Sequence, residues 1–73
     1  MNRAEHLAWC KRRALDYVEL GELPNAVASM GSDMGKRPDT KLGPSGALLH
    51  MIGLQAAMRG NAPEVRRWIE GFD

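Results

Sequence analysis

Residues 61–72 read NAPEVRRWIEGF, and this stretch has the clearest amphipathic pattern in the chain. At helical spacing its large apolar side chains share one side of a helix over about 62–72, namely Val65, Trp68, Ile69 and Phe72. Asn61 and Glu64 have the spacing of a capping box, and Pro63 suits a first helical turn. The stretch therefore predicts an amphipathic α-helix whose apolar side packs against the rest of the chain.

Three further segments upstream have helical composition and are separated by glycines and prolines. We expect these helices at about residues 3–20, 24–35 and 45–59. Asn2 and Glu5 have capping-box spacing for the first of them, and Gly21 supplies a left-handed stop. Strand-forming residues are scarce, with one Thr, three Val and two Ile in the chain. The sequence predicts an all-α fold of three or four short helices.

The apolar positions of the first three helices indicate how they pack. The first helix has an apolar arc made of Ala4, Leu7, Cys10, Ala14, Leu15, Tyr17 and Val18. Lys11 interrupts this arc, and Trp9 lies outside it. The second has an apolar stripe of Leu23, Val27, Met30 and Met34. Beside it runs a stripe of Ala28, Gly31 and Gly35, which predicts close approach of a neighbouring backbone. The third is apolar on nearly every side, so we expect it to be the central helix on which the others pack.

Length and composition limit the classes of protein that fit. The chain has 73 residues, which predicts one domain over 1–73. No run of about 18 apolar residues is present, and charges interrupt the N-terminal apolar stretch, so we expect neither a membrane span nor a signal peptide. A single cysteine excludes an internal disulfide and a cysteine-rich zinc module. These features predict a small cytoplasmic domain.

The residues that most often carry catalysis or bind metals are sparse. His6 and Cys10 share one side of the first helix, but a metal site needs a third ligand, so we expect a buried thiol beside a surface imidazole. Asp33 has no carboxylate partner in the sequence, and no glycine-rich phosphate loop is present. We therefore expect no enzymatic activity, no metal and no cofactor.

Basic residues gather in three places, and these are the candidate binding residues. The net charge is only +1, which argues against binding driven by bulk electrostatics. The three groups are Trp9, Lys11, Arg12 and Arg13 in the first helix, Lys36, Arg37 and Lys41 in the 36–46 loop, and Arg66 and Arg67 in the last helix. Trp9 and Arg13 are four residues apart and can stack, and this pair of residue types is common at protein-interface hot spots. The alternatives are that the cations are simply solvated and that Trp9 folds back onto a neighbouring helix.

A helix-turn-helix DNA reader is a second hypothesis for the same residues. The third and fourth helices are joined by a short turn at Gly60 and Asn61, and the fourth helix carries Arg66 and Arg67. Two arginines offer few contacts to DNA bases, so the sequence favours a protein partner over DNA. An anti-repressor domain belongs to this same alternative.

Three segments resemble a family of very short proteins encoded by bacteriophages. The segments are AEHLAWCKRRALDYVELGEL at 4–23, NAVASMGSDMGKRPDT at 25–40 and PEVRRWIEGF at 63–72. The family includes a transcription regulator of a lytic phage that binds host RNA polymerase. No functional residue is carried over from the family to this chain.

The resemblance implies a monomer in the host bacterial cytoplasm that contacts the large subunits of RNA polymerase near the RNA exit region. Such a protein inhibits sigma-dependent initiation and promotes antitermination at intrinsic terminators. A host elongation factor and nascent RNA are further candidate partners. An accessory phage protein with another host partner remains a third hypothesis.

Overall fold

The computed structural model describes all of residues 1–73 and contains four α-helices and no strand. The helices are α1 (Arg3–Glu19), α2 (Leu23–Met34), α3 (Gly46–Met58) and α4 (Ala62–Glu70). The all-α prediction is confirmed, and the number of helices is four. None of the helices is both long and apolar enough to cross a membrane.

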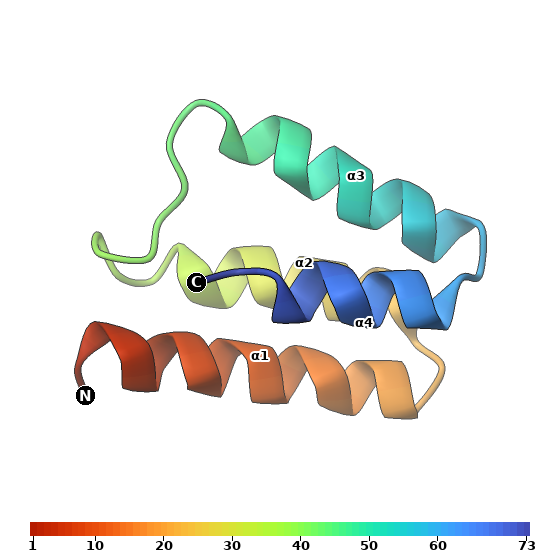
Figure 1. Cartoon of the computed structure of the whole chain (residues 1–73), viewed down its shortest axis with the longest axis horizontal. Helices are drawn as coiled ribbons and strands as arrows, with labels where there is room; N and C mark the ends of the chain where they lie inside the picture. The colour runs from red at the N-terminus through yellow and green to blue at the C-terminus, as the bar shows by residue number, and fades with distance from the viewer.

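Successive helices run in opposite directions, and α2 and α4 lie between the other two (Figure 1). Helix α2 contacts all three of its neighbours, and so does α4. Helices α1 and α3 share no contact with each other, because the α2–α4 pair separates them. Both termini lie at the end of the molecule where the loop between α2 and α3 runs (Figure 1).

The ends of α1 form as the sequence predicts. The Asn2 side chain accepts a hydrogen bond from the Glu5 backbone N–H at 2.8 Å, and the Glu5 carboxylate accepts one from the Asn2 backbone N–H at 3.1 Å. The predicted capping box is therefore complete. Gly21 follows the helix with a φ of 75°, the left-handed conformation that glycine adopts without strain.

The start of α4 forms only half of its predicted capping box. The Asn61 side chain accepts a hydrogen bond from the Glu64 backbone N–H at 3.2 Å. The Glu64 carboxylate, however, bonds the Asn61 side-chain amide at 3.0 Å and not the Asn61 backbone. That backbone N–H already donates to the Ala56 carbonyl at the end of α3, 3.1 Å away, so it is not free to complete the box.

One core of 13 buried apolar residues joins the four helices, and its composition corrects the expected role of the third helix. The members are Leu7, Cys10, Ala14, Val18, Leu23, Ala26, Val27, Met30, Met34, Ala56, Ala57, Val65 and Ile69. Helix α2 supplies five of them, whereas α3 supplies only the two alanines. The prediction that the third helix is central is therefore wrong. A chain of this size encloses too little volume to surround an additional helix with large side chains.

Helix α3 packs on α4 through the ring of Trp68. A Cβ atom added at Gly53 would lie 2.6 Å from that ring, so only glycine allows the indole to approach α3 this closely. The indole Nε1–H donates to the Leu49 carbonyl at 2.9 Å. Phe72 meets the same indole edge to face, with centroids 5.0 Å apart and planes at 87°.

The glycine-containing side of α2 meets a side chain and not the backbone that the sequence predicts. A Cβ added at Gly31 would lie 3.3 Å from the imidazole of His50 on α3. Gly35 has only carbonyl groups of its own helix nearby, and Ala28 is exposed. The α2–α3 contact therefore includes an imidazole above a glycine, and the predicted backbone contact is wrong.

The loop between α2 and α3 is fastened to the end of α2. Its anchor is Thr40, a buried residue whose hydroxyl donates to the Met34 carbonyl at 2.7 Å. This bond satisfies one of the carbonyls that the helix end leaves without an intrahelical partner. The residues after Thr40 then run past the ends of α3 and α4 and form one wall of a groove.

Candidate protein-binding surfaces

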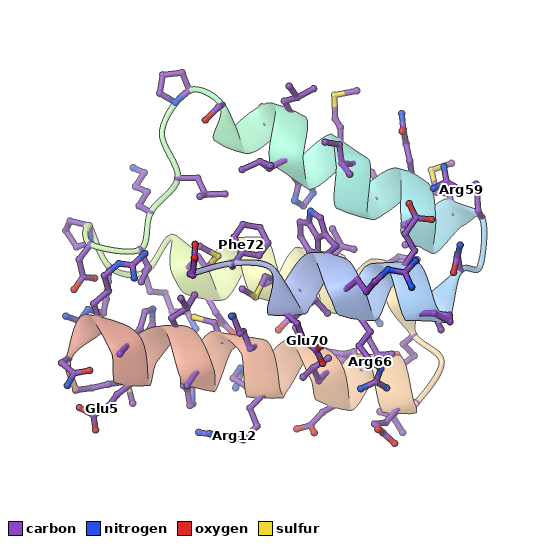
Figure 2. The ribbon with its side chains drawn as sticks, in the orientation of Figure 1. Glu5, Arg12, Arg59, Arg66, Glu70 and Phe72 are labelled. Carbon is purple, nitrogen blue, oxygen red and sulfur yellow. The ribbon has the colours of Figure 1, made fainter.

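The outward side of α3 exposes large apolar side chains, which we call the α3 face. Its members are 47% to 77% exposed, and they are Leu48, Met51, Ile52 and Met58. Side chains extend from this helix away from α2 and α4 (Figure 2). Large apolar side chains that stay exposed on one side of a helix often mark a protein-interaction site.

The spacing of residues within α3 explains why this face exists. Leu48, Met51, Ile52 and Met58 recur at intervals that place them along one side of a helix, over about 15 Å of its length. The opposite side holds Gly53, Ala56 and Ala57, which are buried. No charged residue occurs between Gly46 and Met58. The inner side of α3 therefore carries small residues and can approach Trp68, whereas the bulky apolar residues of the α3 face are exposed to solvent.

Trp9 lies half-buried on α1 within a stack of cationic and aromatic groups. The guanidinium of Arg13 lies 4.8 Å from the indole centroid, which confirms the predicted stacking of this pair. The ammonium of Lys36 lies 5.3 Å from the indole, and the His6 ring stacks on it with centroids 5.6 Å apart. Trp9 is thus held by groups of its own chain.

Asp33 is the charged centre of this cluster, although the sequence presents it as isolated. Its carboxylate accepts hydrogen bonds from Arg13 Nε at 2.8 Å and from Lys36 Nζ at 2.9 Å. The Asp33 residue is only 2% exposed. Burial by itself would raise the pKa of Asp33, but the hydrogen bonds and positive charges of Lys36 and Arg13 outweigh it and hold the pKa below its ordinary value. The partner from α1 is 20 residues away in sequence, so local pattern does not reveal the pair.

His6 and Cys10 lie together inside the protein. Cys10 is buried as predicted, but the prediction of a surface imidazole is wrong, because His6 is only 5% exposed. His6 Nε2 lies 3.0 Å from the Asp33 carbonyl and 3.5 Å from Cys10 Sγ. Burial, together with the negative charge of Asp33, raises the pKa of the Cys10 thiol. The structure gathers no group of three His, Cys, Asp or Glu side chains that could hold a metal ion.

Three other predicted binding residues also have partners within the chain. Lys11 donates to the Glu70 carbonyl at 3.1 Å, which places a cation at the negative end of α4. Arg37 pairs with Asp39 at 2.7 Å and also donates to the Met1 carbonyl. The third is Arg66, which lies 3.6 Å from the exposed carboxylate of Glu19.

The remaining three predicted residues are Arg12, Lys41 and Arg67, and their side chains form no hydrogen bond or ion pair within the chain. Arg12 projects from α1 away from the other helices (Figure 2). Lys41 and Arg67 come from the loop and from α4, and both line the same cavity. The structure therefore separates the nine predicted residues into different neighbourhoods and does not gather them into one patch.

The cavity that Lys41 and Arg67 line is one half of a groove between the start of α1, the loop, α2, α3 and the end of α4. Its two chambers have volumes of about 520 Å³ and 340 Å³. They share five wall residues, namely Met34, Lys41, Leu42, Trp68 and Phe72. Figure 2 shows Phe72 just beyond the end of α4. Sequence reasoning missed this groove because its walls come from five separate segments.

The DNA-binding hypothesis uses α3 and α4, with α4 as the helix that would contact DNA. The packing of α4 limits how much of its surface is free for such a contact. Helix α4 contacts all three other helices, and its Arg66 is directed towards Glu19 on α1. Figure 2 shows Arg66 on the side of α4 that faces α1. Of the two arginines proposed to read DNA, only Arg67 has no partner within the chain.

The fold and these surfaces define a small all-α protein with an uncovered apolar helix face and a cation-lined groove. Comparisons with protein-family models, with curated proteins and with solved structures found no match to this chain.

Proposed function

We propose that this chain is a bacteriophage transcription regulator that binds bacterial RNA polymerase and acts by binding rather than by catalysis. The observation that carries the proposal is the α3 face, where four large apolar side chains stay exposed. A chain with so small a core gains from burying such side chains, and leaving them outside favours a partner that covers them.

A protein partner fits this face better than a nucleic acid does. Helix α3 has no charged residue, so it offers no cation to a phosphate backbone. Six of the nine predicted basic and aromatic residues contact groups of their own chain. Binding that depends on apolar contact and a few free cations is typical of protein–protein interfaces.

The resemblance to short phage proteins supports RNA polymerase as this partner. Occupation of surface that a sigma factor also needs inhibits initiation. A domain held near the RNA exit region promotes antitermination by hindering the terminator hairpin. A host elongation factor and nascent RNA are secondary partners in this proposal, and the large polymerase subunits are the primary ones.

Purified polymerase tests the proposal directly. The chain is immobilised, and recovery of bacterial core enzyme is compared for the wild type, Met51→Glu/Ile52→Glu on the α3 face and Arg12→Glu/Arg13→Glu on α1. We expect the α3 variant to lose at least about tenfold in affinity, because two carboxylates would be desolvated in an apolar contact. Circular dichroism confirms that each variant is folded.

Transcription assays provide the second measurement. We expect the wild type to reduce sigma-dependent initiation and to increase read-through of an intrinsic terminator. Absence of saturable polymerase binding, together with unchanged transcripts at saturating protein, would reject the proposed function. Equal binding by the wild type and the α3 variant would reject the α3 face as the contact.

A further inference from the structure

The geometry points to the groove along the loop between α2 and α3 as a docking site for a short acidic segment of a partner protein. This segment carries one large apolar side chain. The identity of the protein that contains this segment, RNA polymerase, rests on the proposed function. The site itself follows from the shape of the groove, its apolar walls and its charges.

The shape of the groove suits a side chain and its neighbours. Its two chambers, of about 520 Å³ and 340 Å³, are each in the size range of cavities that hold small ligands. Its apolar wall includes four residues that are only partly buried, Leu42, Leu49, Trp68 and Phe72. A large apolar group that enters would cover surface which the fold itself leaves open.

The polar wall residues favour an anion. The side chains of Lys41 and Arg67 have no partner within the chain, whereas Arg3 donates to backbone oxygen atoms of Asp39 and Asp73. The carboxylate of Asp39 is already paired with Arg37. Asp73 is the one unpaired side-chain carboxylate on the wall, so the unpaired cations outnumber it.

The two kinds of wall residue together select the class of partner. An apolar side chain without charge would leave Lys41 and Arg67 unpaired, and a phosphate without an apolar group would leave the chambers unfilled. A segment with carboxylates beside a large apolar residue satisfies both. Because both cations are exposed, we expect each to contribute modestly and to set charge preference more than total affinity.

The two tryptophans make the test specific. The probe is the N-acetylated, C-amidated peptide Glu-Glu-Ile-Phe-Glu, titrated into the isotope-labelled chain while the indole N–H signals are followed by NMR. Trp68 lines the groove and Trp9 does not, so we expect the Trp68 signal to shift saturably and the Trp9 signal to stay in place. The Trp9→Phe variant assigns the two signals.

Control peptides and variants separate charge from apolar contact. Lys-Lys-Ile-Phe-Lys and Glu-Glu-Gly-Ser-Glu are expected to bind at least about tenfold more weakly. Lys41→Gln and Arg67→Gln are each expected to weaken the acidic peptide about two- to fivefold. Asp73→Asn is expected to strengthen it by a similar factor, because it removes a carboxylate from the wall. Arg12→Gln, a free cation on α1, is the matched control and leaves binding unchanged.

The outcomes distinguish this inference from the proposed function. No shift at Trp68, equal binding of the lysine peptide, or an equal Trp68 shift with a hexauridylate RNA would overturn the groove assignment. Polymerase capture that survives Lys41→Glu/Arg67→Glu without loss would also overturn it, while leaving the proposed function in place. Peptide binding with the expected variant effects, in a chain that does not capture polymerase, supports the groove and rejects the proposed function.

Discussion

Helices α1 and α3 lie on opposite sides of the α2–α4 pair and present different surfaces to solvent. Helix α1 buries Leu7, Cys10, Ala14 and Val18 and exposes charged residues such as Arg12 and Glu5 (Figure 2). Helix α3, in contrast, buries small residues, glycine and alanine, and exposes large apolar ones, leucine, isoleucine and methionine.

This difference teaches that apolar content alone does not determine burial. Helix α3 is the more apolar of the two, yet α1 supplies more of the core. Burial depends on which side chains meet a neighbouring helix, and the indole of Trp68 leaves room only for a side of α3 without bulk. Three predictions test this contrast, in order of decreasing expected effect.

The largest effect is expected from a matched pair of isoleucines. Ile69 is fully buried in α4, and Ile52 belongs to the α3 face. We expect Ile69→Ala to lower the free energy of unfolding by about 2–4 kcal/mol, since it leaves a cavity in the core. Ile52→Ala is expected to change it by less than about 0.5 kcal/mol. Urea unfolding followed by circular dichroism measures both, and equal losses would mean that the α3 face is covered in solution.

The next effect concerns the inner side of α3. We expect Gly53→Val to lower the free energy of unfolding by about 1–3 kcal/mol, because the new side chain would collide with Trp68 and separate α3 from α4. Loss of near-ultraviolet circular dichroism from the indole should accompany it. Gly43→Ala is the control, since a Cβ there meets no atom within 4 Å. A neutral result for Gly53→Val would show that α3 is not held by this contact.

The smallest of the three effects concerns the ion pairs between α1 and α2. We expect Asp33→Asn to lower the free energy of unfolding by about 1–2 kcal/mol at neutral pH, because Arg13 and Lys36 lose a buried charged acceptor. Urea unfolding measures this loss. The exposed carboxylate of Asp16 provides the control, and Asp16→Asn is expected to change stability by less than about 0.5 kcal/mol.

The pH dependence of the same variant has a definite sign. The folded pKa of Asp33 lies below its unfolded value of about 3.9, so the carboxylate contributes stability above that pH. The contribution is lost as the pH falls from there through the folded pKa. Unfolding measured across this acid range should therefore be less pH-dependent in Asp33→Asn than in the wild type, and parallel curves would contradict the assignment.

Local sequence signals predicted the helices well and the packing of one helix badly. The capping box at Asn2, the left-handed turn at Gly21 and the apolar side of α4 depend on residues a few positions apart, so they were readable. The role of α3 depended on Gly53 meeting Trp68, which a periodicity pattern does not contain. A periodicity pattern likewise does not contain the contacts with α2 that bury His6.

The candidate surfaces were harder to predict for the same reason. The stacking of Trp9 with Arg13 was foreseen because both residues lie on one helix. The pairing of Arg13 with Asp33 was not, and it shows that a cluster of cations in sequence is not a cluster of free cations. The groove has walls from several elements, so only the folded chain brings Lys41 and Arg67 to it.

The sequence by itself determined the all-α class, the approximate helix boundaries and the sides on which apolar residues gather, because these follow from contacts between residues within one or two helical turns. Only the tertiary structure decided that α3 stays at the surface with its large side chains uncovered, and which cations remain unpaired. The physical reason is that burial and ion pairing are settled by competition between distant segments for a small interior.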